Sequence, residues 1–235
     1  MKKLFTEPIL LGSEIIVQMF TPRATKEEKP DTGPYTYHLI RGTHTGEGCY
    51  LPYRIVVTID PGRKNFGFRI EKRESNGVVV PLAYVRTSFV ESSPETLYYD
   101  IYRFLNQYYK VWNEVTSVVV ERQLPINYKT GRIAQHVISY FTMVLSQNKH
   151  NSVIFEVNAF LKGKMFGGPK GKIELKKWSS PTAIAIFKEQ NDWWSISIIE
   201  EEKKKDDIGD AKIQLEALIK QLRNEASSLL SFILP

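Results

Sequence analysis

Residues 54–62 read Arg-Ile-Val-Val-Thr-Ile-Asp-Pro-Gly. The β-branched run from Ile55 to Ile59 predicts a strand, and Asp60-Pro61-Gly62 predicts the tight turn that ends it. Residues 66–73 and 78–89 predict two more strands, joined through an Asn76-Gly77 pair of the kind that hairpin turns favour. Together the three segments predict an antiparallel meander.

Helices and strands alternate after this meander. Ser93-Pro94 is a helix-start signal, and apolar residues at helical spacing follow as far as Trp112. The remaining expected elements are strands at 116–120 and 153–157, a small strand at 196–199, and helices at 131–145, 180–190 and 206–230. This order predicts an α/β fold in which helices flank a mixed five-stranded sheet.

Residues 1–50 differ from the rest of the chain. They carry six Lys/Arg and six Asp/Glu, so the whole net charge of +6 lies in 51–235. Residues 21–35 are rich in Pro, Lys and Glu and predict a flexible loop, whereas 8–20 fit either a strand pair or a helix. We therefore expect an N-terminal extension of unknown role over 1–50 and a catalytic domain over 51–235.

Composition excludes several classes of protein. With 235 residues, 42% hydrophobic and 25% charged, the chain is neither disordered nor collagen-like. Its single cysteine, Cys49, excludes an internal disulfide and fits a reducing, intracellular compartment. No apolar stretch is long enough for a membrane span, and 9–12 is too short for a signal-peptide core, so we expect neither a membrane partner nor a signal peptide.

Four acids stand where predicted elements begin or end. Asp60 and Glu121 each close a strand, and Asp207 and Asp210 lie three residues apart at the start of the last helix. If the two strands are neighbours, Asp60 and Glu121 emerge side by side. The sequence offers this cluster no obvious cationic partner, and hard oxygen ligands without Cys or His favour Mg²⁺ or Mn²⁺.

The sequence around these acids resembles the RuvC-like resolvases. Residues 59–67, Ile-Asp-Pro-Gly-Arg-Lys-Asn-Phe-Gly, resemble the first family motif, and 118–123, Val-Val-Val-Glu-Arg-Gln, resemble the second. Residues 204–211, Lys-Lys-Asp-Asp-Ile-Gly-Asp-Ala, resemble the last motif in the form found in resolvases of poxviruses and other large DNA viruses. The resemblance covers about 54–222. Gly209 is a poor helix former, and we expect it to let the last helix approach the sheet closely.

The resemblance implies a ribonuclease H-like fold and a homodimer that resolves four-way (Holliday) DNA junctions by paired nicks. Two Mg²⁺ ions per site, replaceable by Mn²⁺, would be held by Asp60, Glu121, Asp207 and Asp210, and the cut would leave 5′-phosphate ends. Whether Asp206 also binds metal stays open. The viral form of the last motif adds the cytoplasm of an infected cell, or a virion, to the expected locations.

Basic and aromatic residues near the acids predict DNA contacts. Arg63 and Lys64 follow Asp60, and a loop after Glu121 carries Arg122, Gln123, Tyr128, Lys129 and Arg132. Residues 162–177 hold six lysines and one acid among glycines, which predicts a basic loop that binds DNA phosphates. The six lysines are Lys162, Lys164, Lys170, Lys172, Lys176 and Lys177.

Each feature also has an ordinary structural interpretation. Asp60 alone fits a turn, Asp207 alone fits a first-turn acid of a helix, and a lysine run alone fits a solvated surface. The function also has alternatives: a ribonuclease H-like nuclease on other branched DNA or RNA–DNA hybrids, or a non-catalytic protein that binds junctions. Only the joint occurrence of the four acids in order favours the resolvase.

Overall fold

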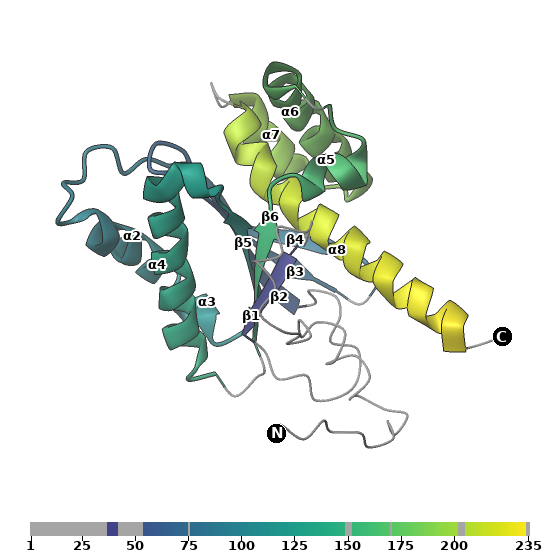
Figure 1. Ribbon diagram of the computed structural model, residues 1–235, viewed down its shortest axis with the longest axis horizontal. Helices are drawn as coiled ribbons and strands as arrows, with labels where there is room; N and C mark the ends of the chain where they lie inside the picture. The colour runs from purple at the N-terminus through teal and green to yellow at the C-terminus, as the bar shows by residue number, and fades with distance from the viewer. Residues whose placement is uncertain are drawn as a thin grey trace, which may run out of the picture.

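The computed structural model describes residues 37–41, 54–74, 76–148, 152–169, 171–201 and 205–233. These residues form one six-stranded mixed sheet with helices on both faces (Figure 1). The predicted loop at 21–35 and the segment 8–20 lie outside the described residues. Within the described ranges, no helix is both long and apolar enough to cross a membrane.

The five predicted strands are confirmed. β2 (Arg54–Pro61), β3 (Phe66–Arg73) and β4 (Val79–Thr87) form the antiparallel meander, and β5 (Val115–Arg122) and β6 (Val153–Asn158) run parallel to β2. The strand order is β1-β6-β5-β2-β3-β4. The centre of β2 is buried on both faces, as its unbroken run of β-branched residues requires.

A sixth strand, β1 (Tyr37–Arg41), comes from the predicted N-terminal extension. It pairs antiparallel with β6 and so covers an edge of the sheet that would otherwise offer unpaired backbone groups. The Tyr37 hydroxyl donates a 2.7 Å hydrogen bond to Glu225 on the long C-terminal helix. The sequence prediction omitted β1 because a five-residue strand carries little periodic signal.

Three helices cover one face of the sheet: α2 (Leu97–Asn106), α3 (Tyr109–Trp112) and α4 (Tyr128–Leu145) (Figure 1). The single helix predicted up to Trp112 is therefore two helices, with a turn at Gln107-Tyr108. Trp112 is buried, and its indole N–H donates to the Tyr140 hydroxyl at 2.9 Å. This bond and the aromatic packing around it fix α4 against α3.

The other face is covered by α5 (Leu161–Phe166), α6 (Lys172–Glu189), α7 (Trp193–Glu201) and α8 (Lys205–Ile233) (Figure 1). Leu215 and Leu218 of α8 belong to the same buried cluster as Val56 of β2 and Val119 of β5. The long final helix predicted at 206–230 is thus confirmed, and it lies across the strands that carry the predicted acids.

Two element predictions on this face are wrong. α6 begins at Lys172 and continues through Pro181, so Ser180-Pro181 is not a helix start. Pro181 has no N–H for the Lys177 carbonyl four residues earlier, yet the helix continues through it. The Thr182 hydroxyl donates to the next carbonyl, that of Trp178, at 2.8 Å. The segment 196–199 belongs to α7 rather than to a strand, since a short apolar run does not distinguish the two structures.

Candidate active site at the edge of the sheet

Asp60 and Glu121 lie at the carboxyl ends of neighbouring parallel strands. Ile59 of β2 is in register with Val120 of β5, so the residue after each emerges at the same edge of the sheet. The predicted juxtaposition therefore holds, because it required only that the two strands be neighbours. Next along this edge is β6, whose Val157 is in register with Glu121.

Helix α8 adds Asp210 to this edge. One Asp210 carboxylate oxygen accepts a hydrogen bond from the Ser179 hydroxyl of α6, and the other lies 3.2 Å from the Lys162 Nζ. Gly209 precedes it and allows close helix packing: a Cβ at this position would lie 2.9 Å from the Ala183 Cβ. The expectation that Gly209 brings α8 close to the sheet is wrong, since the close neighbour is α6.

Lys162 stands among these acids. Its side chain is 6% exposed, and its Nζ lies 2.7 Å from Glu121 Oε2 as well as 3.2 Å from Asp210 Oδ2. Burial lowers the pKa of Lys162, but the attraction of Glu121, Asp210 and Asp60 outweighs burial and raises that pKa above its ordinary value. Lys162 is therefore an ammonium ion. The expectation that the acids have no cationic partner is wrong.

The glycine-rich stretch that carries Lys162 is not a loop. Most of residues 162–177 lies in α5 and in the first turns of α6. Gly167 ends α5 in the left-handed conformation, with φ 69°, and a Cβ on Gly168 would lie 3.2 Å from the Trp178 ring and 2.8 Å from the Gly163 Cα. Gly168 thus packs against Trp178 of α6, while α5 itself packs against α8, and Lys162 points inward to Glu121 and Asp210.

The other lysines of this stretch are distributed over the two helices. Lys164 is exposed on α5, and Lys176 and Lys177 are exposed on α6. Lys170 and the side chain of Lys172 lie outside what the structure describes. The predicted DNA contacts of the exposed lysines remain a prediction.

The Arg63 side chain forms hydrogen bonds within the protein. Its guanidinium donates to the carbonyls of Phe89, Val90 and Ser92, at 3.2, 3.2 and 2.7 Å. This ties the turn after Asp60 to the segment that follows β4. Its neighbour Lys64 is exposed. Any phosphate contact by Arg63 would have to share these donors.

A cleft of about 340 Å³ lies beside Glu121, at the start of α4. Four predicted DNA residues line it, namely Arg122, Gln123, Tyr128 and Arg132. The Gln123 amide also donates to Glu121 Oε1 at 3.3 Å, and Tyr128 is 62% exposed. Lys129 is exposed on α4 but does not line the cleft. The helix begins at Tyr128, so the predicted start at Gly131 is wrong.

The oxygen donors at this edge suit a hard divalent cation. Asp60, Glu121 and Asp210 come from three elements, and the attraction of each raises the pKa of Lys162. Their combined negative charge therefore favours a cation where they converge. Among the side chains that the structure describes, no three acids, histidines or cysteines already form a metal-binding group. The predicted fourth ligand, Asp207, lies on α8, but its side chain is outside the described part.

Sequence reasoning missed the roles of Lys162 and Ser179. The sequence places Lys162 with five other lysines in a basic stretch that predicts phosphate contacts. The available signal was its apolar setting, with Phe160 and Leu161 before it and Met165 and Phe166 after it. A lysine in such surroundings, a few residues after a strand, is a candidate for burial with an acid. Ser179 offered no comparable signal.

Comparison with known proteins supports the fold. The fowlpox virus resolvase, solved with substrate Holliday junction DNA, matches with a TM-score of 0.50 at 16% identity, over 72% of this chain and 98% of the resolvase. The chain has the fold of the RuvC-like resolvases. Thermus thermophilus RuvC matches with a TM-score of 0.49 over 74% of this chain and 96% of RuvC, also at 16% identity. The match to the fowlpox virus resolvase confirms the predicted ribonuclease H-like fold.

Sequence comparison is less informative. No family model matches the chain. An uncharacterized protein, 170L of Invertebrate iridescent virus 6, is 26% identical over 133 residues, which cover 48% of this chain and 54% of that protein. The chain thus spans about half the length of this curated relative.

Proposed function

We propose that this chain is a metal-dependent endonuclease that resolves four-way DNA junctions by paired nicks. The observation that carries the proposal is the convergence of Asp60, Glu121 and Asp210 on Lys162 at the carboxyl edge of a resolvase-type sheet. Three partly buried acids around one ammonium leave an excess of negative charge, which a bound cation would neutralise. The fowlpox virus resolvase, which shares the fold, was solved with junction DNA.

In this proposal, Asp60, Glu121, Asp207 and Asp210 hold the divalent ions. Bound there, Mg²⁺ would polarise the scissile phosphate and supply an activated water for in-line attack. Glu121 is held in place for this role, since one of its oxygens faces Lys162 and the other accepts from Gln123. Asp210 is held likewise between Ser179 and Lys162.

Lys162 would contribute a fixed positive charge. Its ammonium offsets the mutual repulsion of the acids and faces the edge where negative charge would develop on a phosphate. A charge held in place by burial and two ion pairs needs no reorganisation during reaction, which is the condition for effective electrostatic stabilisation.

The surfaces on both sides of the acids suit a branched DNA. The cleft with Arg122, Arg132 and Tyr128 lies on the α4 side, and the exposed Lys164, Lys176 and Lys177 lie on α5 and α6. Basic side chains bind phosphates without reading bases, and an exposed tyrosine can stack on an unpaired base. One acid cluster per chain cuts one strand, so paired nicks would require a homodimer.

A panel of substrates tests this proposal. Purified full-length chain would be incubated with Mg²⁺ or Mn²⁺ and a labelled four-way junction, three-way junction, flap or RNA–DNA hybrid. The expected result is symmetric nicking of the four-way junction at a rate well above the others, with 5′-phosphate ends that ligase can seal. Preferential cutting of the flap or the hybrid would identify that nucleic acid, instead of the four-way junction, as the substrate. Binding of these substrates without cutting any of them would contradict the proposal that the chain is a nuclease.

A further inference from the structure

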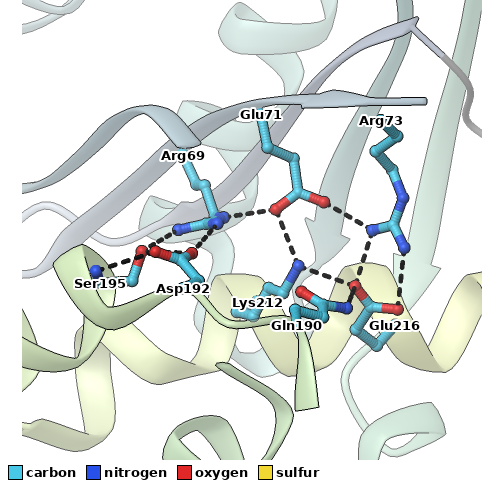
Figure 2. Close-up of polar contacts among 8 residues, drawn as sticks. All are labelled: Arg69, Glu71, Arg73, Gln190, Asp192, Ser195, Lys212 and Glu216. Carbon is cyan, nitrogen blue, oxygen red and sulfur yellow. Dashed lines mark hydrogen bonds and ion pairs between the residues drawn. The ribbon is translucent and has the colours of Figure 1, made fainter. Parts of the chain in front are cut away.

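A network of charged side chains lies inside the protein, between β3 and the helices α6, α7 and α8 (Figure 2). Arg69, Glu71 and Lys212 are fully buried in it. Its ionised members are three cations, Arg69, Arg73 and Lys212, and three anions, Glu71, Asp192 and Glu216. The network is therefore electrically balanced.

Glu71 is the centre of the network. Its carboxylate faces three cations: Arg69 Nε at 2.6 Å and Lys212 Nζ at 2.8 Å on one oxygen, and Arg73 on the other (Figure 2). From α8, Lys212 also pairs with Glu216 at 2.8 Å, and Glu216 pairs with Arg73 at 2.6 Å. Strand β3 and helix α8 are thus joined by a closed ring of ion pairs.

A second branch joins the same strand to the turn between α6 and α7. Arg69 donates to Asp192 and to the Ser195 hydroxyl, both at 2.7 Å, and Asp192 accepts the Ser195 backbone N–H at 3.0 Å. The Arg69 guanidinium also lies against the rings of Tyr84 and Phe187, 4.9 Å from each centroid. Gln190 at the end of α6 donates to Glu216 at 2.9 Å.

The network lies next to the acids of the candidate site. Gly67 of β3 is in register with Asp60, and Arg69 follows it by two residues. On α8, Lys212 follows Asp210 by two residues. The ring of ion pairs therefore joins the strand pair that carries Asp60 to the helix that carries Asp210.

Apolar packing alone does not fix the rotation of α8. Residues 211–215 are all buried, so this part of the helix has no exposed face that would fix its rotation. A shift by one residue turns the helix by about 100° and would carry Asp210 away from Lys162. The polar contacts select one rotation: Lys212 and Glu216 meet β3, and Gln214 donates to the Val157 and Asn158 carbonyls of β6, at 3.0 and 3.3 Å.

We propose that Glu71 and Lys212 are positioning residues, whose ion pairs fix the rotation of α8 and thereby the geometry of the divalent-cation site at Asp60, Glu121 and Asp210. This inference rests on the proposed function for the role of the cation. Buried ion pairs are rarely more stabilising than apolar residues of the same volume, so a role in specifying register accounts for their presence better than stability does.

The test uses the charge-balanced double variant Glu71→Gln/Lys212→Met in the full chain. Arg69 keeps Asp192 and Arg73 keeps Glu216, so no charge is left without an opposite partner. The matched control is Lys72→Met/Glu74→Gln, which removes an ion pair on the neighbouring residues whose side chains are 52% and 41% exposed. Folding is checked by thermal melting, and Mn²⁺ affinity is measured from the electron paramagnetic resonance signal of free Mn²⁺.

We expect the Kd for Mn²⁺ to rise at least about tenfold in the double variant and less than twofold in the control, at a temperature where both are folded. Metal-free binding of a four-way junction should change less than twofold in both. If the double variant does not fold, Arg73→Met/Glu216→Gln replaces it, with the same expected rise. An unchanged Kd for Mn²⁺ in a folded variant overturns the inference, as does a wild type that binds no Mn²⁺.

The same experiment separates this inference from the proposed function. A wild type that binds Mn²⁺ but nicks no branched substrate would contradict the junction resolvase. The comparison of Mn²⁺ affinities between the double variant and its control would still decide whether Glu71 and Lys212 position the site.

Discussion

At the scale of the residue, Lys162 is the site residue whose position differs most from the sequence prediction. A lysine counted among surface charges is instead held between Glu121 and Asp210, where its charge is retained against the cost of burial. Its neighbour Lys164, on the same short helix, is exposed. The two lysines therefore allow the role of the buried charge to be separated from general attraction for DNA.

Replacement of Lys162 by methionine should slow junction cutting by at least about 100-fold, since a preorganised charge at a reacting centre is typically worth about 10²–10³ in kcat. Single-turnover cleavage at saturating enzyme measures this directly. Lys164→Met is the matched control and should leave the rate at saturation within about threefold while it weakens binding. Equal rates for Lys162→Met and wild type would remove Lys162 from the site.

The positions of two candidate acids can be predicted from the sequence, whereas the orientation of Lys162 cannot. Asp60 and Glu121 each end an apolar run, which fixes their place at a strand end without any tertiary information. The direction in which Lys162 points depends on the packing of α5 against α8 and on the close approach of Gly163 to Gly168. Spacing along the chain does not contain that information.

At the scale of the element, the junction of α6 and α8 positions Asp210. The absence of a side chain at Gly209 brings α8 against Ala183, and Ser179 lies one turn away to bond Asp210. The glycine is therefore required by a helix–helix contact, and its low helix propensity is the cost of that contact.

The variant Gly209→Ala should be less stable than wild type. The new Cβ would meet Ala183 at 2.9 Å, and overpacking of this kind costs roughly 1–3 kcal/mol, which exceeds the gain of about 1 kcal/mol in helix propensity. Thermal melting should show a lower Tm. The control is Gly131→Ala in α4, where a Cβ would meet nothing within 4 Å, and there the Tm should rise. A higher Tm for Gly209→Ala would contradict the close contact.

Strands were easier to predict than the helices of the second face. β2, β5 and β6 are marked by β-branched runs, and β3 and β4 by the Asn76-Gly77 turn between them. α6 and α7 carry misleading local signals, namely Pro181 within a helix and the short apolar run Ile196 to Ile199. Both are decided by tertiary packing, because Ala183, Phe187 and Ile196 form one buried cluster.

At the scale of the whole molecule, a balanced set of buried charges ties the sheet to the helices that complete the site. Burial raises the pKa of Glu71, but the attraction of Lys212, Arg69 and Arg73 outweighs it and lowers that pKa to about 2, from 4.5. A sequence alone does not predict such a network, since its members on β3 are separated by more than 120 residues along the chain from their partners on and before the helices α7 and α8.

This shift gives the molecule a defined acid dependence. Because the pKa of Glu71 is lower in the folded than in the unfolded state, its charge stabilises the fold above pH about 4.5, and that contribution is lost as the pH falls toward 2. Urea unfolding across this range should show a falling free energy of unfolding. The dependence should be weaker in Glu71→Gln/Lys212→Met, and equal slopes in both proteins would contradict the assignment.

The most direct measurement of the central claim is a nicking assay on a synthetic four-way junction with Mg²⁺, with wild type and Asp60→Asn side by side and binding measured in parallel. The account predicts paired symmetric nicks by wild type, and none by Asp60→Asn at equal or tighter junction binding, since the variant carries less negative charge near the phosphate. Cutting by Asp60→Asn at the wild-type rate, or no cutting by either protein, would contradict the account.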